Sequence, residues 1–193
     1  MTDAAIPYYP PKKHRTHEVC GAGAVFFALV LAARLGGPVI WVREAWQAAQ
    51  LTPSGFHPIL DPAHLLIASA RDQTDALAVT EEALRSGAVS LVVTELSKPL
   101  DLTAGRRLQL AARDGKATAL ALIPEGMGSN AAETRWSCAP QFHPEDSTHH
   151  HWELIKNKSG TLGVWDVRWD HSARRIAVVP PVGKRPGSAG APD

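Results

Sequence analysis

The chain has 193 residues, of which 45% are hydrophobic and 20% are charged, and its formal net charge at pH 7 is +1. These proportions are ordinary for one globular domain that is long enough to bury a sizeable core. The near-neutral charge excludes a polyelectrolyte binder of the histone type, although it leaves room for a local basic face. The longest apolar run, residues 22–33, is too short for a membrane-spanning helix, which needs about 20 residues. Cys20 and Cys138 lie far apart in no paired-ligand spacing, so we expect free thiols in a cytoplasmic protein.

The two ends of the chain differ in composition from its middle. Residues 1–15 contain prolines and lysines with no hydrophobic period, and they predict a disordered N-terminal arm. The final stretch, PPVGKRPGSAGAPD, is rich in Pro, Gly, Ala and Ser, and it predicts a disordered tail over residues 181–193. Residues 16–180 are therefore expected to form a single folded domain.

The segment HEVCGAGAVFFALVLAARLGGPVIWV, residues 17–42, predicts a strand, a glycine turn, an apolar helix and a second strand. The helix is expected over residues 23–35, because a Gly-Gly-Pro stop follows it and an apolar VIWV run comes next. A strand, a glycine turn and a helix in this order also begin the phosphate-binding loop of nucleotide-hydrolysing domains.

Further strands and helices alternate along the next part of the chain. HLLIASA, residues 64–70, predicts a short strand, and the apolar spacing after it predicts a helix that ends at Gly87. The β-branched run AVSLVVTEL, residues 88–96, is typical of a strand buried on both faces. LTAGRRLQLAARDG follows an Asp/Thr cap and predicts a second amphipathic helix, before another buried strand at residues 117–124.

After Pro124 the pattern changes to an alternation of apolar and polar residues. TRWSCAPQF, HHWELIKNK and TLGVWDVRWD predict strands with one solvated face, and HSARRIAVV predicts a last strand. The predicted fold is therefore α/β, with a mostly parallel central sheet, flanking helices and a C-terminal antiparallel extension.

The glycine turn retains only part of a phosphate-binding loop. Gly21 and Gly23 keep the turn, but AVFFA at residues 24–28 supplies neither the lysine nor the hydroxyl that a nucleotide and Mg²⁺ require. Glu95 ends a buried strand where an acidic residue would serve a metal or a water, and here it lacks those partners. We predict a vestigial nucleotide loop of Gly21, Gly23 and Glu95, without ATPase activity and without a cofactor. The alternatives are a turn kept only for packing and a glutamate at a solvated strand end.

Basic residues suggest where a partner or DNA would bind. Arg106 and Arg107 lie in the middle of a predicted helix, whereas Lys156 and Lys158 alternate along a predicted strand and so share one face. Arg135 comes from the same C-terminal region. We predict that these five residues contact a partner or a phosphate backbone, with ordinary solvated charge as the alternative.

Other residue types give weaker indications. His149, His150 and His151 are consecutive, so their side chains alternate, whereas a zinc site needs ligands that converge from different elements. We therefore predict no metal site. Four of the six tryptophans lie after Pro124, where they indicate core packing or an interaction surface. No Ser–His–Asp, Cys–His or paired-carboxylate arrangement stands out, so no catalytic residue is predicted.

Several segments in the same order resemble the ImuA family, the RecA-related accessory proteins of bacterial SOS mutagenesis. They are HEVCGAGAVFFALVLAA, EEALRSGAVSLVVTEL, LDLTAGRRLQLAA, SNAAETRW and WELIKNKSGTLGVWDVRWD, and the resemblance extends over roughly residues 16–179. It implies a RecA-like core that does not hydrolyse ATP productively. It also implies action in translesion synthesis beside RecA, an error-prone replicative-type polymerase and ImuB, a Y-family-like polymerase relative without catalytic residues.

A different function remains open at this point. SulA-like cell-division inhibitors are also RecA relatives without a phosphate loop, and they bind FtsZ. The longer set of helices and strands in this chain, together with the IKNKSG hairpin, favours the ImuA family.

Overall fold

A computed structural model describes residues 6–180 of the chain. Nine strands of the described part form one sheet in the order β3-β2-β4-β5-β1-β6-β7-β8-β9. The parallel strands are β3 (Leu65–Ala70), β2 (Val39–Glu44), β4 (Leu91–Glu95), β5 (Thr118–Leu122), β1 (Thr16–Cys20) and β6 (Thr134–Pro140). The antiparallel extension consists of β7 (His150–Asn157), β8 (Gly163–Asp170) and β9 (Arg175–Val178). Both the mostly parallel sheet and its antiparallel C-terminal extension are confirmed.

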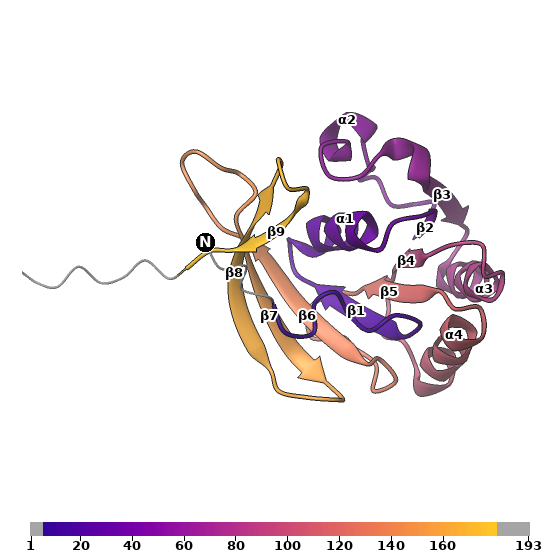
Figure 1. Cartoon of the computed structure of the whole chain (residues 1–193). Coiled ribbons are helices and arrows are strands. Elements are labelled where there is room, and N and C mark those ends of the chain that lie inside the picture. Colours follow the sequence, from indigo (N-terminus) through magenta and orange to yellow (C-terminus); the bar gives the residue numbers. More distant parts are fainter. Residues whose placement is uncertain (1–5, 181–193) are drawn as a thin grey trace, which may run out of the picture.

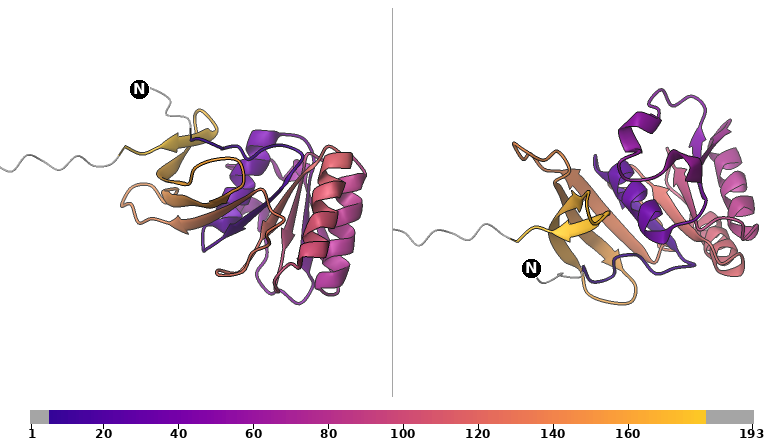
Figure 2. Two further views of the ribbon diagram at one scale, coloured as in Figure 1. Left: turned by 90° about the horizontal axis from the view of Figure 1, so that it is seen from below. Right: turned by 45° about the horizontal axis from the view of Figure 1, so that its top comes forward.

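Helices cover both faces of the parallel part of the sheet. Helix α1 (Ala24–Leu35) and the short α2 (Pro53–Phe56) lie on one side, and α3 (Gln73–Arg85) and α4 (Leu102–Asp114) lie side by side on the other (Figures 1 and 2). A 3₁₀ turn, Pro62–His64, leads from α2 into β3. Neither this turn nor α2 was predicted from the sequence. Among residues 6–180, no helix combines the length and the apolar character needed to cross a membrane.

The central strands alternate their side chains between two cores, as expected for strands buried on both faces. In β4, Leu91 and Val93 join the core under α1, whereas Val92 joins the core under α3 and α4. In β5, Leu120 and Ala121 divide in the same way. A period of two on a continuously apolar strand therefore builds both layers at once.

Sequence signals at the helix ends agree closely with the structure. Asp101 accepts a hydrogen bond from the Ala104 N–H at 2.7 Å, which satisfies one of the free amides at the start of α4. The carboxylate of Asp72 does the same for α3, accepting from the Asp75 N–H at 2.9 Å. Helix α1 ends at Gly36, whose φ of 69° lies in the left-handed region that favours glycine.

The N-terminal segment departs from its prediction. Ile6 is buried, and the ring of Tyr9 lies 5.8 Å from that of Phe27 and 5.1 Å from that of Trp152. His17 Nε2 donates to the carbonyl of Lys12 at 2.8 Å. The prediction of a disordered arm is thus wrong for residues 6–15, because two apolar side chains among the prolines are enough to anchor them. Residues 1–5 and the predicted tail, 181–193, lie outside the described residues.

Candidate functional site: the turn after the first strand

The turn between β1 and α1 is closed by strand β6. Gly21 has a φ of +89°, and a side chain there would also strike the backbone carbonyl of Cys138. A Cβ atom on Gly23 would lie 2.8 Å from His150 Cδ2 and 3.0 Å from the Cys138 carbonyl oxygen. The Gly23 N–H donates to that oxygen at 2.8 Å. A backbone donor of the kind that would cradle a phosphate is therefore used within the protein itself.

The first turn of α1 is built into the core. Phe27 is fully buried, with ring centroids 4.7 Å from Trp152 and 5.4 Å from Trp136. Phe26 stacks on His150 at 3.9 Å with an interplanar angle of 3°. Burial lowers the pKa of His150, and this keeps the stacked ring neutral at pH 7. These residues stand where a phosphate loop carries its polar groups, and their side chains hold the helix against β6 and β7.

Glu95 has partners that the sequence did not suggest. Its Oε1 accepts from Trp41 Nε1 at 2.6 Å, and its Oε2 lies 3.3 Å from Arg43 Nη2. Both members of the ion pair are largely buried, with side-chain exposures of 10% for Arg43 and 16% for Glu95. The alternative interpretation of Glu95 as a solvated strand end is therefore wrong. The arginine neutralises the carboxylate of Glu95, and the indole N–H fixes its orientation.

A cavity of about 350 Å³ adjoins this ion pair at the carboxyl ends of the parallel strands. Its walls are mainly apolar and include Val25, Leu51 and Leu122 beside Arg43 and Glu95. Ligands of open parallel sheets bind at this edge, so the place is where a nucleotide would be expected. Its apolar lining and internally paired charges offer little to a triphosphate.

Three of the predicted contact residues come together around one segment, Ser129–Ala132. Arg135 Nε donates to Glu18 Oε2 at 2.8 Å, and Glu18 is fully buried in the middle of β1. The other oxygen of Glu18 accepts from the Ser129 N–H at 2.8 Å. A glutamate inside a predicted central strand is a signal of such a buried pair, and the sequence analysis did not use it.

The two lysines of the IKNKSG hairpin serve the same segment. Lys156 Nζ donates to the carbonyls of Ser129 and Ala132 at 2.9 and 2.8 Å, and Lys158 Nζ donates to that of Ala131 at 2.8 Å. Burial, followed by the nearby charge of Arg135, lowers the pKa of Lys156. Both ammonium groups turn back onto the protein. The lysines share a direction as predicted, but they are not a pair of outward-pointing charges.

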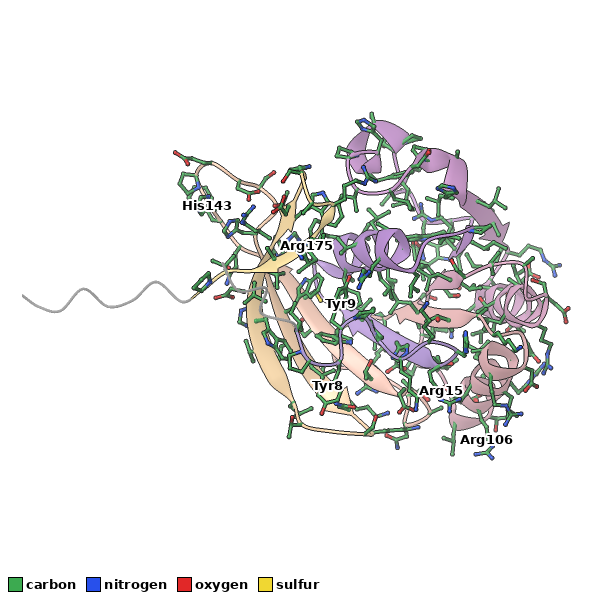
Figure 3. All side chains as sticks on the ribbon, viewed as in Figure 1. Tyr8, Tyr9, Arg15, Arg106, His143 and Arg175 are labelled. Atoms are coloured by element: carbon green, nitrogen blue, oxygen red, sulfur yellow. The ribbon has the colours of Figure 1, made fainter. Side chains whose placement is uncertain are left out.

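The two arginines of α4 differ from each other. Both are exposed, but Arg107 Nη2 pairs with Glu81 Oε2 at 2.7 Å and ties α4 to α3, whereas no ion pair of Arg106 is seen among the described residues. Figure 3 shows Arg106 on the same side of the molecule as Arg15. Gln109, three residues after Arg106, accepts from the Thr16 N–H at 2.9 Å, so this face of α4 adjoins the start of β1. Lys12 and Lys13, which precede that strand in the chain, are also exposed.

Tryptophan and histidine side chains are also placed by the structure. Trp136, Trp152 and Trp169 are buried, and Trp165 is partly buried against the same core, so core packing accounts for the tryptophans after Pro124. Within residues 6–180, no group of three or more His, Cys, Asp or Glu residues is arranged to hold a metal ion. Cys20 and Cys138 are free and buried.

Comparison with known proteins supports the family resemblance described in the sequence analysis. No family model matches the chain. Two relatives named Protein ImuA, from Caulobacter vibrioides strains NA1000 / CB15N and ATCC 19089 / CIP 103742 / CB 15, are each 36% identical over 148 residues. The match covers 64% of this chain and 59% of each relative, so the chain spans about three fifths of the length of these relatives. The resemblance to the ImuA family is thereby confirmed over the matched residues.

Proposed function

We propose that the chain is a non-catalytic, RecA-like accessory factor in SOS-induced mutagenesis and translesion DNA synthesis. Its relationship to the ImuA proteins supports the process. The observation that carries the non-catalytic role is the hydrogen bond from the Gly23 N–H to the Cys138 carbonyl, made beside a fully buried Phe27. The RecA-like core is supported by β1, which lies inside a parallel sheet and leads through a glycine turn directly into α1.

A lack of ATP turnover follows from this turn. A phosphate loop needs free backbone donors, a lysine and a hydroxyl, whereas here a donor is used and the side chains are apolar. A steady-state assay should detect no turnover above background. Turnover on the order of 1 s⁻¹, typical of modest enzymes, would contradict the proposal. Titration of Mg-ATP by calorimetry should likewise give no binding heat, with RecA as the positive control.

The partners we propose are ImuB, RecA and the error-prone replicative-type polymerase, with DNA as a further one. We assign this role to the exposed Lys12, Lys13 and Arg106 and to the partly buried Arg15. Charges at such a surface mainly change the rate and the salt dependence of association. The lysines of the hairpin are poorer candidates, because their ammonium groups are used on Ser129–Ala132.

The experiment combines capture and mutagenesis. Tagged protein is incubated separately with ImuB, RecA, single-stranded DNA and FtsZ, and the bound partner is measured. Damage-induced mutation is measured in cells in which the gene for this chain is deleted and then replaced by the parent or by a variant. We expect capture of at least one of the first three, and weaker capture and fewer induced mutations with the double variant Lys13→Glu/Arg106→Glu.

The control reverses an equally exposed charge on another surface. Arg71→Glu changes a side chain that is 88% exposed and lies in a local pair with Asp75. It should behave as the parent does. Capture of FtsZ alone would favour the SulA-like alternative. An unchanged frequency of induced mutation in cells that lack the chain would contradict a role in mutagenesis.

A further inference from the structure

A second cavity, of about 400 Å³, lies away from the glycine turn. Its walls come from the N-terminal arm, the C-terminal half of α1 and the turn between β8 and β9. Figure 3 labels Tyr9 on the arm and Arg175 on β9, two of the residues that line it. The volume lies within the range of about 300–1,000 Å³ that is usual for small-molecule sites.

The charge of this cavity is one-sided. Three arginines line it, Arg34, Arg174 and Arg175, and no carboxylate of the described residues does. Arg34 makes no ion pair or hydrogen bond within residues 6–180. Arg174 donates one N–H to the carbonyl of Ile59 at 3.0 Å, which leaves its charge unpaired by any described carboxylate. Two of these positive charges, Arg34 and Arg174, have no carboxylate partner among the described residues, and such charges gathered in a hollow concentrate anions there.

The remaining walls are apolar, with Ile6, Val30 and Ile176 among them. We propose that this cavity binds a small organic phosphate. The phosphate is held by Arg34 and Arg174, and the apolar body of the ligand lies against the aliphatic walls. Two arginines from different elements match a dianion better than a single carboxylate, because each can offer a bidentate pair of N–H donors. The site is separate from the proposed partner surface.

The same chemistry is presented by a free mononucleotide and by the 5′-phosphate end of a DNA strand, so the experiment includes both. Calorimetry on the full chain measures binding of adenosine 5′-monophosphate, adenosine, inorganic phosphate, and one oligonucleotide with and without its 5′-phosphate. We expect the monophosphate to bind at least about tenfold more tightly than adenosine, as charge-assisted hydrogen bonds require. Preference for the phosphorylated oligonucleotide over the monophosphate assigns the site to strand ends, and the reverse assigns it to free organic phosphates.

Variants decide whether the cavity is responsible. Arg34→Gln and Arg174→Gln should each weaken binding of the monophosphate about tenfold, whereas Arg71→Gln, the same change of charge outside the cavity, should not. Equal affinity in parent, Arg34→Gln and Arg174→Gln overturns the proposal. So does the absence of binding by every phosphate-bearing probe at millimolar concentration.

Discussion

The two faces of the sheet are filled with side chains of very different size. Under α1 the core is aromatic and includes Trp41, Trp136, Trp152, Trp169 and Phe27. Under α3 and α4 it consists largely of alanines from strands and helices, among them Ala76, Ala83, Ala111, Ala112, Ala119 and Ala121. The difference reflects how each face is covered. Helices α3 and α4 lie side by side on the alanine face, whereas α1, the short α2 and the N-terminal arm cover the aromatic face (Figure 1).

Close backbone approach accompanies the small side chains. A Cβ atom on Gly115, just after α4, would strike the backbone of Leu84 in α3, and one on Gly105 would lie 2.8 Å from Ala131 Cβ. The aromatic face should therefore be sensitive to the loss of volume, and the alanine face to its gain.

The largest effect is expected from a truncation on the aromatic face. Trp152→Ala removes a fully buried ring in contact with Tyr9 and Phe27 and should lower the free energy of unfolding by about 3–5 kcal/mol. Urea denaturation gives the value. Trp46→Ala is the matched control, because Trp46 is 66% exposed and its loss should cost less than about 1 kcal/mol. Similar losses for both variants would contradict the volume argument.

Acid should destabilise the fold through His17, a buried residue of β1. Burial, the largest cause, lowers the pKa of His17 from 6.5 to about 4. The unfolded chain then binds the proton more readily, so the stability present above pH 6.5 is lost as the pH falls toward 4. The full loss is about 3 kcal/mol.

Urea denaturation at pH 7 and pH 5 tests this in the parent and in His17→Gln. The variant cannot titrate at this position, so its stability should fall less between the two values. His150 contributes in the same direction, because burial also lowers its pKa. An equal fall in parent and variant would mean that His17 titrates normally.

The alanine face should show the opposite sensitivity, with a smaller effect. Ala111→Leu adds volume at a fully buried position of α4 and should destabilise by about 1–3 kcal/mol. Ala78→Leu makes the same change on the exposed side of α3 and should leave stability within about 0.5 kcal/mol. If Ala111→Leu left the stability unchanged, the alanine face would be less tightly packed than the close contacts at Gly105 and Gly115 indicate.

The smallest effect concerns the start of α4. Asp101→Ala removes the acceptor for the Ala104 N–H and should cost about 1 kcal/mol, whereas Asp101→Asn keeps an acceptor and should cost much less. Thermal melting of the two variants side by side provides the measurement. If both melt alike, the charge of Asp101 rather than its hydrogen bond stabilises the helix.

Much of this fold could be predicted because its signals are local. Apolar runs placed β4 and β5, and Asp101 marked the start of α4. The arm was wrong because Tyr9 gains its stability from Phe27 and Trp152, residues whose proximity no local pattern reveals. Partners of the candidate site were missed for the same reason.

Long-range pairing decided what the site residues do. Glu95 meets Arg43 across neighbouring strands, and Arg135 meets Glu18 from 117 positions away in the sequence. The lysines of the hairpin were assigned the correct face, but the carbonyls of Ser129–Ala132 that receive them come from an irregular segment. An alternating pattern predicts the face of the sheet on which a side chain lies, but it does not predict which groups that side chain contacts.

Strand β1 joins the two halves of the sheet, pairing in parallel with β5 on one edge and β6 on the other. It precedes both partners by about a hundred residues, and its own five residues are all buried. During synthesis, neither edge of β1 can be paired until β5 and then β6 have left the ribosome. Such distant contacts slow folding, and a strand with open edges invites association in the meantime. The strand at the centre of the sheet is therefore synthesised long before its two partner strands. Nascent chains that stop before residue 118 should be the most prone to aggregate.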